Sequence, residues 1–85
     1  MKPYKISIKL TSHSLDDDIH IKTALNKLFS HPASVRICVQ RLKIDYIFPI
    51  QYRLTVWYYL RGDWTPEMWM AEHLKMGEIE SEVEK

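Results

Sequence analysis

The chain has 85 residues, of which 46% are hydrophobic and 27% charged, and its formal net charge is +1. This length provides one domain with one core, and the composition is that of a folded protein. The two glycines argue against a glycine-rich phosphate loop, and the single cysteine excludes an internal disulfide. No apolar run approaches the roughly 20 residues that span a bilayer, and no secretory signal is recognisable. We expect a soluble protein of the cytoplasm, or of the nucleus in a eukaryote.

The first predicted elements are a strand and a helix. Isoleucine and leucine alternate with polar residues over 4–11, which predicts a half-buried strand. Ser14 is a suitable N-cap, and the aspartates at 16–18 are favoured in a first helical turn by the helix dipole. Apolar residues then recur at helical spacing until Pro32, which disfavours further helix. The pattern predicts a helix over 14–30.

The next segment, 34–48, fits two structures. Apolar residues alternate with polar ones along it, and the phase of the alternation changes at Gln40-Arg41, which predicts a strand with a β-bulge at that point. The alternative is a helix over 34–45 that is capped by Ser34. The frequent β-branched residues favour the strand.

The most unusual segment is 51–61, which we predict to be a strand with two different faces. The face that suits burial in a core carries Tyr52, Leu54, Val56, Tyr58 and Leu60. The opposite face is amphipathic and cationic, which suits contact with a partner. Its residues are Arg53, Thr55, Trp57, Tyr59 and Arg61.

A second helix is predicted over 65–80. Thr65 as N-cap and Pro66 at the first helical position mark its start. Residues 78–85 are acidic with few apolar side chains, and we expect this tail to fray. The order β-α-β-β-α predicts one small α+β domain over 1–85, with a three-stranded, mainly antiparallel sheet and two helices.

No motif for catalysis, a cofactor or a metal ion emerges from the sequence. Aspartates 16–18 lie near His13 and His20, but successive helical residues point about 100° apart, and stabilisation of the helix start accounts for them. Cys38 lies between apolar neighbours and is interpreted as a small buried hydrophobe. We therefore expect no enzymatic activity, no cofactor and no bound metal.

The cationic face of 51–61 has three interpretations. The second helix could cover it while the arginines reach outward. It could be a protein-binding hot spot, where Trp, Tyr and Arg are frequent, or it could stack nucleobases and bind phosphates. We favour a small intracellular adaptor or inhibitor that docks on a protein or nucleoprotein partner and does not act on membranes. A homodimer through the same face would also bury it.

The main alternative is a nucleic-acid-binding domain. If 34–45 is a helix, the chain resembles a helix-turn-helix arrangement, and the residues facing nucleic acid would be Arg36, Gln40, Arg41 and Lys43. In size and element order the chain also resembles small bacterial and phage regulatory proteins that act on larger nucleoprotein assemblies by surface contact. No residue motif carries this resemblance, so it assigns no site residues.

Overall fold

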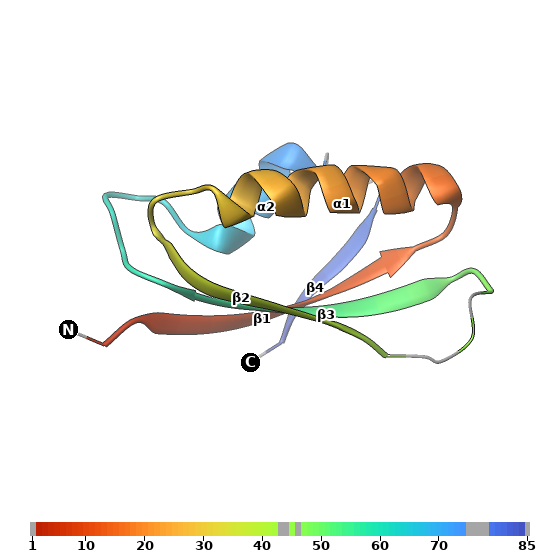
Figure 1. The fold of residues 1–85 in the computed structure, drawn as a ribbon, viewed down its shortest axis with the longest axis horizontal. Coiled ribbons are helices and arrows are strands. Elements are labelled where there is room, and N and C mark those ends of the chain that lie inside the picture. Colours follow the sequence, from red (N-terminus) through yellow and green to blue (C-terminus); the bar gives the residue numbers. More distant parts are fainter. Residues whose placement is uncertain (1, 43–44, 46, 75–78, 85) are drawn as a thin grey trace.

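The computed structural model describes residues 2–42, 45, 47–74 and 79–84. Its elements are β1 (Tyr4–Ser12), α1 (Leu15–Phe29), β2 (Ser34–Arg41), β3 (Ile50–Tyr58), α2 (Pro66–His73) and β4 (Glu80–Glu84). The strands form one antiparallel sheet in the order β2-β3-β1-β4, and both helices lie on the same face of it (Figure 1). This order is the ferredoxin-like topology, in which two β-α-β units interlock.

Helix α1 begins where the sequence predicts. The Ser14 side chain accepts a hydrogen bond from the Asp17 backbone N–H at 3.2 Å, and the Asp17 carboxylate accepts one from the His13 backbone N–H at 2.9 Å. These bonds satisfy backbone donors that a helix start leaves without partners. The predicted helix over 14–30 is confirmed to within a residue at each end.

The third aspartate of this turn points inward. Asp18 is buried, and the Tyr52 hydroxyl donates to its two carboxylate oxygens at 3.1 and 3.2 Å. Burial, and then the negative charge of Asp18, raise the pKa of Tyr52 above its ordinary value. The contact ties α1 to β3.

The core lies between the helices and the sheet. Leu10, Leu28, Leu54 and Val56 are fully buried there, because alternate residues of the central strands face the apolar side of α1. Helix α2 adds Trp69 and Met70 to the same cluster, and its C-cap residue Leu74 also belongs to it. The buried side chains of α2 thus belong to the core on the helix side of the sheet, together with those of α1.

The sheet has four strands, not the three predicted. The acidic end that was expected to fray over 78–85 forms β4, which pairs with β1 and places Val83 opposite Ile8. Residues 78 and 85 themselves lie outside the described part. Ile79, just before β4, is buried. The backbone of β4 forms its hydrogen bonds with β1, a strand far away in the sequence, and the residue pattern of 78–85 alone does not reveal that partner.

Helix α2 is shorter than the predicted 65–80. Its start is confirmed, because the Thr65 hydroxyl accepts a hydrogen bond from the Met68 backbone N–H at 3.3 Å. The helix ends at His73, and the residues that follow at 75–78 are not described.

Segment 34–41 is a strand, so the helix alternative is wrong there. Ile37 lies opposite Val56 of β3. The predicted bulge at Gln40-Arg41 is also wrong, since the register shifts between Ser34 and Arg36. The extra residue is accommodated where β2 joins the sheet after α1, not at its far end. β2 ends at Arg41, and the described residues of the predicted continuation, 42, 45, 47 and 48, are not in a strand; residues 43, 44 and 46 lie outside the described part.

Candidate functional site

The face of the sheet opposite the helices is open. In an antiparallel sheet, residues directly opposite each other share a face, so the side chains beside Trp57, Thr55 and Arg53 of β3 lie on one surface. In β1 and β2 these are Lys5, Ser7, Lys9, Arg36, Cys38 and Gln40. No helix in the described parts of the chain covers this face (Figure 1). The interpretation in which the second helix covers it is therefore wrong.

Trp57 lies between two cations on this face. The guanidinium carbon of Arg36 is 4.9 Å from the Trp57 ring centroid, and the Lys5 Nζ is 5.6 Å from it. The two cations come from the strands on either side of β3, because both residues are the register partners of Trp57. Each contact is a cation–π interaction, which holds a flexible basic side chain close to the sheet.

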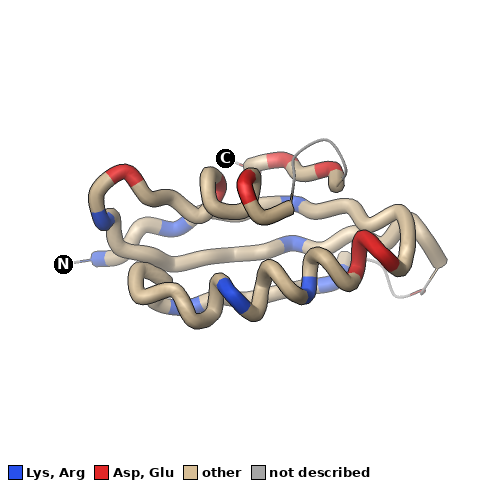
Figure 2. The backbone as a smooth tube through the Cα atoms, turned by 90° about the horizontal axis from the view of Figure 1, so that it is seen from above, with Lys and Arg blue, Asp and Glu red and all other residues tan. Residues whose placement is uncertain are grey.

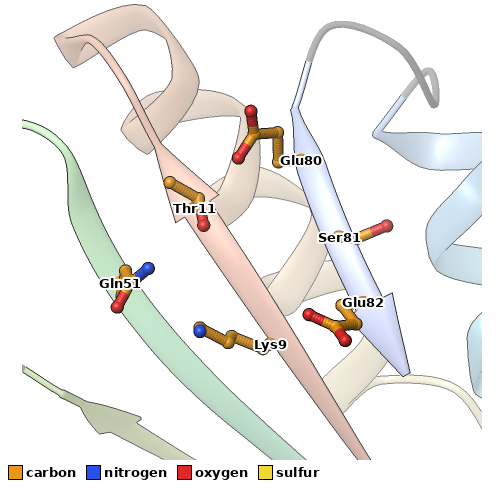
Figure 3. A pocket seen from close by; sticks show the side chains of 6 residues that line it. All are labelled: Lys9, Thr11, Gln51, Glu80, Ser81 and Glu82. Atoms are coloured by element: carbon orange, nitrogen blue, oxygen red, sulfur yellow. The ribbon is translucent and has the colours of Figure 1, made fainter. Parts of the chain in front are cut away.

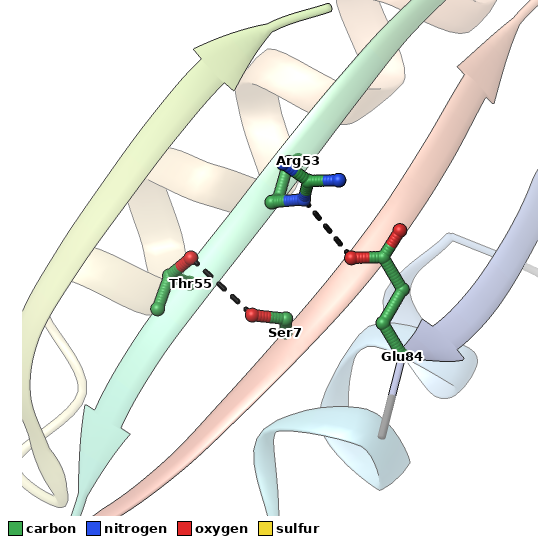
Figure 4. A network of polar contacts seen from close by, with 4 residues as sticks. All are labelled: Ser7, Arg53, Thr55 and Glu84. Carbon is green, nitrogen blue, oxygen red and sulfur yellow. Dashed lines mark hydrogen bonds and ion pairs between the residues drawn. The ribbon is translucent and has the colours of Figure 1, made fainter.

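A polar network connects the centre of the face with β4 (Figure 4). The Arg53 Nε donates to the Glu84 carboxylate at 2.9 Å, reaching across β1, and the Ser7 and Thr55 hydroxyls lie 3.5 Å apart. The ion pair neutralises the Arg53 charge. Arg53 is therefore a less available cation than Arg36 or Lys5.

The β4 side of the open face is acidic. Glu80, Glu82 and Glu84 lie opposite open-face residues of β1, and β4 appears as acidic segments near the C-terminus in Figure 2. Glu80 and Glu82 line a depression of about 240 Å³ together with Lys9 (Figure 3). Glu80 also lies 3.4 Å from the His13 ring. The face is therefore basic and aromatic on one side and acidic on the other.

Two of the five predicted partner-binding residues, Tyr59 and Arg61, come after the end of β3. β3 ends at Tyr58, opposite Tyr4 in the first paired position of β1. The next residue, Tyr59, donates its backbone N–H to the Ala33 carbonyl at 3.0 Å. Arg61 forms an isolated bridge with Trp64 in the following turn. The structure thus places Arg53, Thr55 and Trp57 together on the open face, whereas Tyr59 and Arg61 lie beyond the end of β3; that these five residues bind a partner stays a prediction.

Leu60, predicted to be buried, is also outside the strand and is 51% exposed. The strand prediction extended too far because the alternation of side chains continues past the point where β1 offers partners.

The residues of the helix-turn-helix alternative do not form a recognition helix. Arg36 and Gln40 lie on the open face of β2, whereas Arg41 lies opposite Tyr52 and so belongs to the helix side of the sheet. Lys43 is outside the described residues. This form of the nucleic-acid hypothesis is wrong because the segment is extended.

Lys5, Lys9 and the three β4 glutamates also belong to the face, and none of them was predicted from the sequence as a site residue. Both lysines alternate with apolar residues in the first predicted strand, which signals an outward-facing side. Lys5 and Lys9 lie beside Trp57 and Arg53 because β1 pairs with β3, and this pairing cannot be predicted from the residue pattern of β1 alone.

Other candidate sites are not assembled. Cys38 is exposed and not buried as expected, because its place opposite Thr55 puts it on the open face of the sheet. Over the described ranges, no three His, Cys, Asp or Glu side chains gather in a way that could hold a metal ion. In that same part of the chain, neither helix has the length and apolar character needed to cross a bilayer.

Comparison of the chain with models of protein families, with curated proteins and with solved structures found no match.

Proposed function

We propose that the chain is a non-catalytic binding domain, an adaptor or inhibitor, that docks on a protein partner through the open face of its sheet. The observation that supports this proposal is the position of Trp57 between Arg36 and Lys5 on a face that no described helix covers. Tryptophan and arginine are the residues that most often dominate protein interfaces.

The partner surface in this proposal is acidic where it meets the Trp57 region. The two cation–π contacts hold Arg36 and Lys5 in place before binding, which lowers the entropy lost when they pair with carboxylates. The glutamates of β4 would face basic residues of the same partner. A partner with this charge pattern docks in one orientation, because the reversed orientation opposes like charges.

Single-stranded nucleic acid is the second candidate ligand. It is favoured by the four basic residues on one open sheet, namely Lys5, Lys9, Arg36 and Arg53. Two observations favour the protein partner instead. Arg53 is already paired with Glu84, and the row of β4 carboxylates would repel a phosphate backbone that crosses the whole face.

The proposal is tested by capture from lysate of the source organism with the tagged chain, comparing Trp57→Ala and Lys5→Glu with wild type. Trp57→Ala should reduce the amount of the captured protein by about tenfold or more, since hot-spot truncations cost at least about 2 kcal/mol. The matched control is Lys22→Ala, which removes an exposed cation from α1 on the other side of the sheet and should leave capture unchanged. Circular dichroism verifies the folding of each variant. Undiminished capture by folded Trp57→Ala would refute the proposal.

Nuclease treatment of the lysate separates the two ligands. Capture through a protein surface survives the nuclease. Capture that disappears with nuclease, and that weakens steeply with salt, would replace the protein partner with nucleic acid.

A further inference from the structure

The two edges of the sheet differ in their protection against pairing. β4 carries a glutamate at every second position, so a β4 edge would meet another copy of itself with like charges. β2 is an eight-residue edge strand without acidic residues, lysine or proline. Its Val35 and Val39 are 49% and 41% exposed. Arg36, Arg41 and the irregularity near Ser34 lie towards the ends of this edge, whereas the stretch from Ile37 to Gln40 carries no charge, proline or bulge and is suited to pairing with a further strand.

The backbone of β2 presents free groups at this edge. The Leu42 N–H donates to the Gln51 carbonyl at 2.9 Å, and in an antiparallel ladder the inward-bonding residues then alternate with outward-facing ones. By this alternation Cys38 and Gln40 bond to β3, whereas the N–H and C=O groups of Ile37 and Val39 point away from the sheet. In the described part of the chain, no strand lies on that side of β2.

We propose that β2 pairs antiparallel with β2 of a second copy of this chain, about a two-fold axis at Cys38. This register places Ile37 opposite Val39 of the second copy and Arg36 opposite its Gln40, so apolar side chains meet next to the axis and no two arginines face each other; Val35 and Arg41 face each other only at the ends of the pairing. Moving the axis to residue 39 would instead place Ile37 opposite Arg41. Moving it to residue 37 would centre the pairing nearer the irregularity between Ser34 and Arg36.

The dimer would form a continuous eight-stranded sheet. A two-fold axis perpendicular to the sheet keeps both open faces on the same side, with the two basic regions at the centre and the β4 strands at the outer edges. The two Trp57 strands would be three strand spacings apart, about 14 Å. This inference does not rest on the proposed function, because the pairing uses the outer backbone of β2, whereas the proposed docking uses the open face of the sheet, to which Arg36 contributes its side chain.

Cys38, the chain's only cysteine, reports on this register directly. By the same alternation it forms a non-hydrogen-bonded pair with Cys38 of the second copy, at a Cα–Cα distance of about 4.5 Å, which a disulfide can span. Wild type should sediment as a dimer and form a disulfide-linked dimer under mild oxidation by oxidised glutathione. The matched control is Cys38→Ser combined with Thr55→Cys, which moves the thiol one strand inward on the same face and should cross-link at least about tenfold more slowly.

Two edge variants test the interface without removing bonds to β3. Val39→Pro deletes an outward-facing N–H, and Val39→Lys keeps the backbone but adds a charge close to the two-fold axis. Both should sediment as monomers and lose the cross-link, and Val39→Lys decides the question if the proline variant does not fold. A monomeric wild type at about 100 μM that does not cross-link would overturn the proposal. So would a dimer that survives Val39→Lys, or a Thr55→Cys thiol that cross-links as fast as Cys38.

Discussion

The contact between Tyr52 and Asp18 gives the sharpest test of how the helix layer is attached to the sheet. Tyr52→Phe removes one hydroxyl and keeps the ring, leaving a carboxylate that is 8% exposed without the donor that reaches both its oxygens. Hydrogen bonds to charged groups contribute about 1.5–3 kcal/mol. We therefore expect the free energy of unfolding to fall by about 2 kcal/mol, which lowers Tm by about 8–16 °C in a domain of this size.

The assay is urea unfolding followed by circular dichroism. Tyr4→Phe is the matched control, because Tyr4 is 56% exposed and its hydroxyl makes no hydrogen bond among the described residues, so its loss should cost under about 0.5 kcal/mol. A double-mutant cycle with Asp18→Ala isolates the pair and should give a coupling of about 1–2 kcal/mol. A Tyr52→Phe variant as stable as Tyr4→Phe, or a cycle with no coupling, would refute the assignment.

Three further outcomes follow from the same structure. Burial first, and then a neighbouring carboxylate, raises the pKa of Tyr52 and of Tyr58 above the ordinary value of 10.0. Because the folded state binds these protons more tightly than the unfolded state, the urea midpoint should be constant below pH 10 and should fall as the pH rises through the raised pKa values. The fall should be less steep in Tyr52→Phe, which has lost one of the two groups. Arg53→Met should lower the free energy of unfolding by under about 1 kcal/mol, because its ion pair with Glu84 is partly exposed, and a urea titration in high salt should shrink the difference. Leu54→Ala should lower it by about 2–5 kcal/mol in the same titration, because the side chain is fully buried.

Elements defined by local patterns were predictable from the sequence. The alternation over 4–11 and the capped run after Ser14 correspond to β1 and α1 to within a residue or two. In β2, the β-branched residues correctly favoured a strand over a helix. These predictions succeed because the same few residues determine both the backbone conformation and the face that is buried.

Features that depend on distant partners were not predictable in this way. β4 has only Val83 as an apolar residue within its bounds, and its pairing depends on the free edge of β1. The end of β3 is set by Tyr4, the first residue of β1 to pair with it. For the same reason the sequence predicted the β3 residues of the candidate face but not their contacts. Lys5 and Arg36 lie against Trp57 because β1 and β2 are the strands on either side of β3.

The place of β1 in the middle of the sheet has a consequence for how the protein is made. Both of its neighbours are encoded later, β3 from Ile50 and β4 from Glu80. During synthesis β1 and α1 are made before either neighbour of β1, so the isoleucines of β1 cannot be buried in a sheet until β3 has been made. A nascent chain halted before Ile50 should bind chaperones that the finished protein does not need.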